Sequence, residues 1–421
     1  MAAKKPHKLT IRSYQVGFGD CFLLSFAYAS SERHVLIDFG TTGQPKDATG
    51  LMRRVAQDIH QRCGGKLHAV VATHRHRDHI SGFDPGKNKK GPGAIIASCK
   101  PDVVVQPWTE DPNAKTDARK PTATLQGKQA FARRLVDMQA TSRAILAELR
   151  RYQRYRMVPA AQLNELAFIG EQNLENLAAV KNLQTMARRH AYVHHGSKSG
   201  LDAILPGVTI SVMGPPTLEQ SDTIQTQRSK DEDEFWHLQA RAGALVEGGS
   251  PPAWKQVAKA PPHARWLRNR LLSERVQTAL ELVRILDDVL NNTSVILLFE
   301  VGGKSFLFPG DAQIENWSYA LSRPADRKRL ARATVYKVGH HGSLNATPKT
   351  LWNTFDHRGA AGKKGRLVTF MSTMAGKHGS EQSKTEVPRR TLVTALRKDS
   401  DLLNTQDLGT GALFNERAFD L

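Results

Sequence analysis

A metal-binding pattern stands out in residues 73–80, Thr-His-Arg-His-Arg-Asp-His-Ile. It holds His74, His76, Asp78 and His79 within six residues, a density that is rare in soluble proteins that bind no metal. Histidines at i and i+2 point to one side of an extended chain, and a tight turn after them can bring in the other two groups. Imidazole with carboxylate suits zinc best, with manganese or iron as alternatives. The competing interpretation is a solvated turn, because two arginines are interleaved with the ligands.

The elements that must position this cluster are short strands. Apolar and alternating runs predict strands over residues 9–14, 21–26, 34–38, 67–72, 103–108, 208–212, 294–300, 305–311, 334–338 and 365–371. Asp38 and Asp311 each end a strand beside a glycine, and His340 and His341 follow another strand. Because ligands collect at strand ends in α/β layers, these four side chains are candidates to join the cluster.

The 421-residue chain has a formal net charge of +20, and its hydrophobic content of 40% is typical of a globular protein. Such a charge attracts polyanions, above all nucleic acid, although a basic proteome or a solubility surface would produce the same number. No run of eighteen apolar residues is present, and no apolar leader precedes a cleavage site, so we expect no membrane segment and a cytoplasmic protein. The three cysteines, Cys21, Cys63 and Cys99, are expected to be reduced.

Two helical insertions interrupt the strand pattern. Residues 121–192 have apolar residues at helical spacing, and residues 217–290 combine a polar loop with a helix. The first insertion carries a candidate nucleic-acid-binding stretch, because arginine contacts phosphates and tyrosine stacks on bases: Arg150, Arg151, Tyr152, Arg154, Tyr155 and Arg156. The alternative is that the tyrosines complete a packed apolar stripe and the arginines face solvent.

Five motifs taken together resemble one known family. They are residues 16–20 (VGFGD), 36–40 (LIDFG), 73–79 (THRHRDH), 309–312 (PGDA) and 337–343 (KVGHHGS). In this order they resemble the metallo-β-lactamase fold and, more narrowly, the hydrolase domain of the DNA-uptake channel ComEC and its stand-alone relatives. The resemblance implies an α/β fold: a single domain over residues 1–421, built as a four-layer αββα sandwich, with the two helical insertions outside the family's minimal fold.

The resemblance also implies a site for one or two zinc ions, with manganese possible. One metal would be held by His74 and His76 and the other by Asp78 and His79, while Asp311 would bridge the two. Zinc bound by such ligands lowers the pKa of its water to roughly 7, which generates a hydroxide nucleophile near neutral pH.

Three further roles follow from the same resemblance. His340 would complete the second metal, with His341 as the alternative, because spacing cannot decide which of two neighbouring imidazoles turns inward. Asp38 would accept a ring N–H from a ligand histidine and fix its tautomer. His378 lies where relatives place a histidine that contacts the leaving group or phosphate, and an ordinary loop histidine is the alternative.

One departure from the family concerns the first metal. Many relatives carry a further histidine in a Gly-His-Thr turn, whereas residues 291–294 here read Asn-Asn-Thr-Ser. The first metal would then have only His74, His76 and Asp311, and would bind weakly or prefer manganese. His194 and His195 are the available substitutes, but their position in a strand argues against them.

These features predict a metal-dependent hydrolase. The leading hypothesis is a phosphodiesterase or nuclease that acts on DNA or RNA through a metal-bound hydroxide, with Asp78, His79, Asp311 and His378 as catalytic residues. The first alternative is hydrolysis of a small phosphodiester or another ester. The second is a nucleic-acid-binding or partner-binding module with a structural metal. Nucleic acid is the expected partner, and the sequence leaves a protein partner open.

Overall fold

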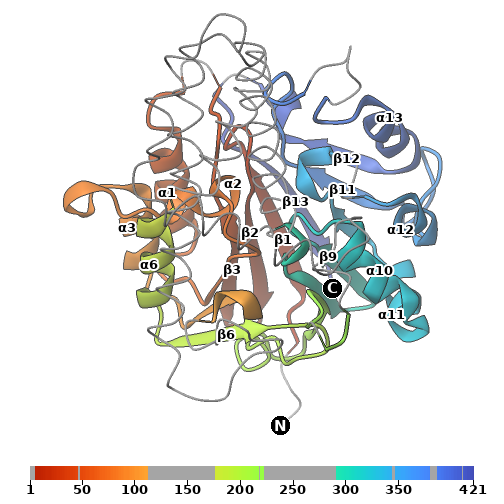
Figure 1. The fold of residues 1–421 in the computed structure, drawn as a ribbon, viewed down its shortest axis with the longest axis horizontal. Coiled ribbons are helices and arrows are strands. Elements are labelled where there is room, and N and C mark those ends of the chain that lie inside the picture. Colours follow the sequence, from red (N-terminus) through yellow and green to blue (C-terminus); the bar gives the residue numbers. More distant parts are fainter. Residues whose placement is uncertain are drawn as a thin grey trace, which may run out of the picture.

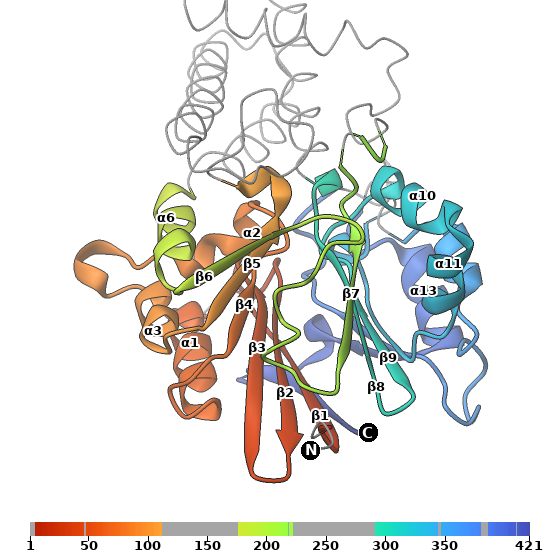
Figure 2. The ribbon, with the colours of Figure 1, turned by 90° about the horizontal axis from the view of Figure 1, so that it is seen from below.

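The computed structural model describes residues 5–45, 48–111, 176–217, 219–221, 291–343, 347–379, 386–409 and 411–421. Within these ranges the chain forms two β-sheets packed face to face, with helices on both outer faces (Figure 1, Figure 2). This is a mixed α/β sandwich, as the strand and helix patterns predict. Most of both predicted insertions, including residues 150–156 with their arginines and tyrosines, lies outside the described residues. No helix in the described ranges is long and apolar enough to cross a membrane.

The first sheet begins as an antiparallel meander. Strands β1 (Lys8–Tyr14), β2 (Cys21–Tyr28) and β3 (Ser31–Phe39) pair in sequence order, and β13 (Phe414–Asp420) pairs with the outer edge of β1. Both faces of β2 are buried, which explains its nearly continuous apolar sequence. Asp38 is buried at the end of β3, where the sequence pattern predicts a carboxylate at a strand end.

The remainder of the first sheet is parallel. Strands β4, β5 and β6 follow β3 in that order, and the outer face is covered by α1, α3 and α6 (Figure 2). Their bounds are β4 (Ala69–Val71), β5 (Val103–Pro107), β6 (Arg189–Val193), α1 (Leu51–Arg62), α3 (Pro92–Ser98) and α6 (Leu177–Thr185). In α1 the predicted helical spacing places Leu51, Val55 and Ile59 in the core.

Helix α6 and strand β6 overlap the end of the first predicted insertion. Helix α6 buries Ala179, Val180 and Leu183 against the first sheet, and β6 is the edge strand of that sheet. Both elements, which overlap the C-terminal part of the predicted range 121–192, therefore pack as parts of the sandwich. Helical periodicity does not distinguish an inserted helix from one that covers a sheet, which explains the overlap.

The second sheet joins an antiparallel hairpin to parallel strands. Its order is β12-β11-β10-β9-β8-β7, in which β7, β8 and β9 are antiparallel and β9 to β12 are parallel. The strands are β7 (Thr209–Gly214), β8 (Ile296–Val301), β9 (Lys304–Phe308), β10 (Val335–Lys337), β11 (Val368–Met371) and β12 (Asp401–Asn404). The helices on its outer face are α10 (Ile314–Ser322), α11 (Pro324–Ala331), α12 (Lys349–Thr354) and α13 (Arg390–Asp399).

Apolar cores fill the spaces between the four layers of the described chain. The central core lies between the sheets and includes Phe22 and Phe26 from the first sheet and Phe299, Phe308 and Phe370 from the second. A second core joins the first sheet to α1, α3 and α6, and a third joins the second sheet to α10–α13. Because each large buried apolar side chain contributes about 1.5–3 kcal/mol, the sandwich is a firm support for the side chains at its strand ends.

Several of the strands that precede the predicted motifs end at one edge of this sandwich. β4 leads to residues 73–80, β9 to Asp311 and β10 to residues 340–342. A hydrogen bond of 2.9 Å from the backbone N–H of Val295 to the carbonyl of Thr73 joins the two sheets there. The short helices in the connections are α2 (Arg77–Ile80), η1 (Ser81–Phe83), η2 (Lys87–Lys89), η3 (Trp108–Glu110), η7 (His340–Gly342) and η8 (Thr405–Asp407).

Candidate metal centre

Asp38 holds the start of the histidine motif. Its Oδ1 accepts a hydrogen bond from the backbone N–H of Thr73, and its Oδ2 accepts one from the Thr73 hydroxyl, both at 2.7 Å. The same Oδ2 lies 2.8 Å from Nδ1 of His79. One buried carboxylate at the end of β3 therefore orients both the end of the β4 segment and a histidine of α2.

Two glycines let the chain pack closely around the motif. A Cβ at Gly40 would collide with the backbone of Asp78, and a Cβ at Gly19 would lie 2.7 Å from the Asp78 carbonyl oxygen. The backbone N–H of Asp20 donates to that same oxygen at 2.9 Å. Gly19 of the VGFGD motif and Gly40 of the LIDFG motif are thus explained by the close approach of three backbone segments.

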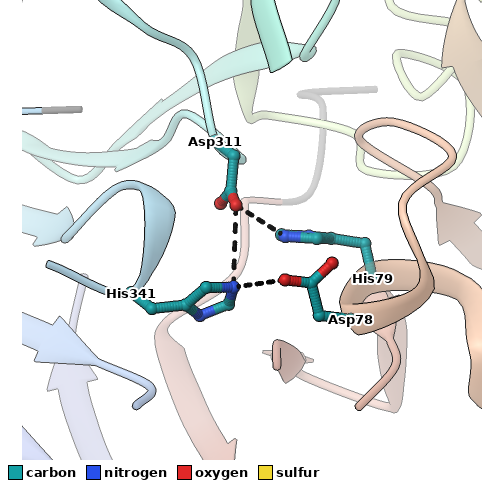
Figure 3. A group of neighbouring side chains, drawn as sticks. All are labelled: Asp78, His79, Asp311 and His341. Carbon is teal, nitrogen blue, oxygen red and sulfur yellow. Dashed lines mark hydrogen bonds and ion pairs between the residues drawn. The ribbon is translucent and has the colours of Figure 1, made fainter. Parts of the chain in front are cut away.

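Four buried side chains from both sheets converge at the sandwich edge (Figure 3). Nε2 of His79 lies 3.0 Å from Oδ2 of Asp311, and Nε2 of His341 lies 3.0 Å from Oδ2 of Asp78 and 3.6 Å from Oδ2 of Asp311. One ligand atom from each residue lies within 4.8 Å of all the others. Two imidazole nitrogens and two carboxylate oxygens at this spacing can hold a metal ion.

The outer nitrogens of both histidines are held by hydrogen-bond acceptors. Nδ1 of His79 faces the Asp38 carboxylate, and Nδ1 of His341 lies 3.0 Å from the carbonyl oxygen of Ser372. A carbonyl oxygen can only accept, so the proton of a neutral His341 ring resides on Nδ1 and the lone pair of Nε2 points into the cluster. Metal-binding histidines usually donate the N–H of their outer ring nitrogen to such an acceptor.

Asp311 divides its oxygens between two tasks. Oδ1 accepts from the backbone N–H of His340 at 3.0 Å and from the Lys337 ammonium at 3.4 Å. Oδ2 is buried and faces the histidines, and it lies 3.0 Å from Nε2 of His79 in an ion pair that gives neither atom a well-formed hydrogen bond. Buried polar atoms without a well-formed hydrogen bond are rare in proteins, and these two face each other where a metal ion would bind. The donor set therefore fits a metal.

A buried ion pair between Asp20 and Lys337 lies next to the histidines of the centre. The Lys337 side chain is 2% exposed, and its ammonium contacts the Asp20 carboxylate as well as the carbonyl oxygen of Gly310 at 3.0 Å. Asp20 in turn lies 3.5 Å from Nδ1 of His341 and 3.7 Å from Nδ1 of His79. Neither residue is among the predicted site residues. A lysine inside an otherwise apolar strand was the available signal.

Asp20, Asp38 and His79 form a second group of possible ligands, but its carboxylates also have partners outside the group. The Asp20 carboxylate faces Lys337, and Asp38 accepts from Thr73 and faces His79. The group that includes Asp311 brings together four buried residues rather than three, so it is the stronger candidate for the metal.

The cluster is strongly polarised in the metal-free protein. Burial lowers the pKa of His79, but Asp311, Asp38 and Asp78 outweigh it and hold that pKa well above its usual value. Burial also lowers the pKa of His341, but Asp311 and Asp20 outweigh it and hold that pKa above its usual value. The histidines in turn hold the pKa of Asp311 well below its usual value against the opposite effect of burial. A metal ion must therefore displace protons from these rings.

His74 and His76 form a pair of neutral imidazoles beside this cluster. Nε2 of His74 lies 3.0 Å from Nδ1 of His76. Burial lowers the pKa of His76 to about 4 and that of His74 well below its usual value, so both rings are neutral near pH 7. They are outside the four-residue group, which makes this half of the site the less complete one. The turn at residues 291–294, where the family's further histidine is missing, is buried, and the Ser294 hydroxyl accepts a hydrogen bond from the backbone N–H of Asp311 at 3.3 Å.

The structure brings His341, and not His340, into the four-residue group. The His340 side chain is 26% exposed, and its Nε2 lies 4.0 Å from Oδ2 of Asp311. His195 is engaged elsewhere, because its Nε2 lies 2.8 Å from Asp326 in α11. His194 directs Nδ1 toward the backbone carbonyl of His195.

His378 lies beside the cluster rather than in it. The Phe18 ring contacts both the His341 ring, at 4.4 Å between centroids, and the His378 ring, at 4.3 Å. Burial lowers the pKa of His378 to about 4, with an opposing influence from Asp78. His378 is thus a neutral group at the rim of the site at pH 7.

No protein-family model matches this chain, and no curated protein matches it. Function is therefore inferred from the chemistry of the metal centre.

Proposed function

We propose that this protein is a metal-dependent hydrolase of the metallo-β-lactamase fold that cleaves phosphodiester bonds in nucleic acid. The observation that carries the proposal is the group of Asp78, His79, Asp311 and His341, with ligand atoms that converge and outer nitrogens held by Asp38 and a backbone carbonyl. The order of the five motifs and the two-sheet sandwich support the choice of fold.

The residues of the centre have distinct tasks in this proposal. Asp78, His79, Asp311 and His341 would hold the ion, with His74 and His76 as a weaker second position. When bound, the metal supplies Lewis acidity, which acidifies water and offsets charge on phosphoryl oxygens. The chain itself fixes the histidine orientations and excludes water from the ligands, because all four are buried.

The net charge of +20 favours nucleic acid over a small ester as substrate. A long-range positive field raises the local concentration of a polyanion, whereas it offers little to a neutral ester. Zinc is the proposed ion, with manganese as the alternative for the less complete position.

A nuclease assay with a panel of zinc, manganese and magnesium tests the proposal. We expect cleavage of labelled single-stranded DNA, double-stranded DNA or RNA that a chelator abolishes and that Asp78→Ala lowers at least about a hundredfold. Asp102→Ala is the matched control, because Asp102 pairs with Lys66 on the surface. Cleavage that survives both chelation and Asp78→Ala refutes the proposal. Turnover of bis-p-nitrophenyl phosphate without nucleic-acid cleavage would restrict it to small phosphodiesters.

A further inference from the structure

Lys377 lies directly across Gly43 at the rim of the metal centre. A Cβ placed on Gly43 would be 2.7 Å from Cε of Lys377 and 3.1 Å from its Nζ, so the lysine stem occupies the space that the glycine leaves open. The side chain is nevertheless exposed. Its ammonium makes no hydrogen bond or ion pair with any other described residue.

A short chain of contacts links this lysine to the cluster. Gly43 pairs with Phe18 in an antiparallel bridge, in which the Phe18 N–H donates to the Gly43 carbonyl at 2.7 Å. The Phe18 ring in turn contacts His341, a member of the four-residue group, and His378, the neighbour of Lys377. Gly43 and Phe18 therefore connect the lysine to His341, one of the proposed metal ligands.

The charges around Lys377 leave its ammonium available to an anion. The adjacent His378 is neutral at pH 7, because burial lowers its pKa to about 4. The carboxylates of the centre are buried and face histidines, Thr73 or Lys337. An exposed cation beside a metal centre, with no carboxylate partner in the described chain, suits an anionic substrate.

We propose that Lys377 binds a phosphate oxygen of the substrate and so makes the site selective for phosphodiesters over neutral esters. This inference rests on the proposed function, because it assigns the charge of the substrate at the same centre. Lys377 would contact the substrate directly, whereas Gly43 would position it by leaving room for its stem.

Gly43 offers a second way to test the placement of the lysine. Its φ lies outside the left-handed region, so alanine fits the backbone there. The three atoms nearest to the added methyl group all belong to the flexible end of Lys377. Gly43→Ala should therefore displace the ammonium without removing its charge.

Equilibrium binding of short oligothymidylates by the metal-loaded protein tests this inference without any measurement of turnover. The charged probe has cleavage-resistant phosphorothioate links, and the neutral probe has methylphosphonate links. We expect Lys377→Met to weaken binding of the charged probe about tenfold and to lower the salt slope by roughly 0.7, with binding of the neutral probe unchanged. Lys377→Arg should restore most of the affinity, and Gly43→Ala should reproduce part of the loss. Lys304→Met is the charge-matched control, because Lys304 begins β9 and thus lies at the opposite end of that strand from Asp311.

The outcomes distinguish the two proposals. Charge-dependent binding through Lys377 without any cleavage supports this inference and contradicts the proposed nuclease. Cleavage by wild type together with normal binding by Lys377→Met contradicts the inference and leaves the nuclease intact. Equal weakening of both probes by Lys377→Met shows a structural role and overturns the inference, as does a Gly43→Ala variant that binds the charged probe like wild type.

Discussion

Substitution of Lys337 by methionine tests how the carboxylate-rich centre stays together without metal. Four carboxylates, those of Asp20, Asp38, Asp78 and Asp311, are buried there, and the Lys337 ammonium contacts two of them. Burial lowers the pKa of Lys337, but Asp20 and Asp311 outweigh it and hold that pKa above its usual value. The lysine is therefore a permanent counter-cation in the described part of the centre.

The size of the effect follows from the burial of the pair. Removal of one partner of a buried ion pair costs about 3–5 kcal/mol, because the other charge is left without compensation. A dication about 4 Å from a carboxylate contributes roughly twice the ~4 kcal/mol of a unit charge at an effective dielectric constant of about 20. A bound metal ion can thus replace much of the electrostatic stabilisation that Lys337 provides to Asp311. Lys337→Met should lower the free energy of unfolding by about 3–5 kcal/mol in metal-free protein and by clearly less in metal-saturated protein.

Urea unfolding of metal-free and zinc-saturated protein measures this difference. The double variant Asp20→Asn with Lys337→Met removes both members of the pair and should recover part of the metal-free loss. Lys304→Met serves as the control for loss of a lysine away from the centre. An equal loss with and without zinc, or no loss in the metal-free protein, would refute the counter-cation role.

Three further outcomes follow from the geometry of the centre. Asp38→Asn should weaken zinc binding about 10–100-fold in competition with a chromophoric chelator, because the amide cannot orient His79 as the carboxylate does, and unchanged affinity would count against the assigned tautomer. His341→Ala should abolish tight zinc binding while His340→Ala retains it, and the reverse order would place the ligand at residue 340. Because the pKa values of His79 and His341 are raised, both rings hold protons above their usual range, so zinc affinity should fall as pH falls. Calorimetry in buffers of different ionisation enthalpy should record release of up to about two protons per ion, and pH-independent affinity would contradict this expectation.

Local sequence patterns predict much of the fold and several of the proposed metal ligands. Alternation of apolar and polar residues marks β1, whereas nearly continuous apolar runs mark β2 and the β8–β9 hairpin, because a strand buried on both faces does not alternate. The position of Asp38 at the end of β3 and that of Asp311 just after β9 could be predicted because the apolar runs of these strands stop beside them. So could the density of ligands at residues 73–80, because those residues are neighbours in the chain.

Other features depend on contacts between segments far apart in sequence. His340 and His341 are adjacent in an irregular turn and both have positive φ, so their directions follow from packing against Asp311 and Ser372 rather than from any period. The Asp20–Lys337 pair joins a loop of the first sheet to a strand of the second, across more than three hundred residues. The contact between Lys377 and Gly43 likewise joins segments that are far apart in sequence. Residue type and local spacing determine which ligands the chain can offer, whereas the packing of the two sheets determines which of them face one another.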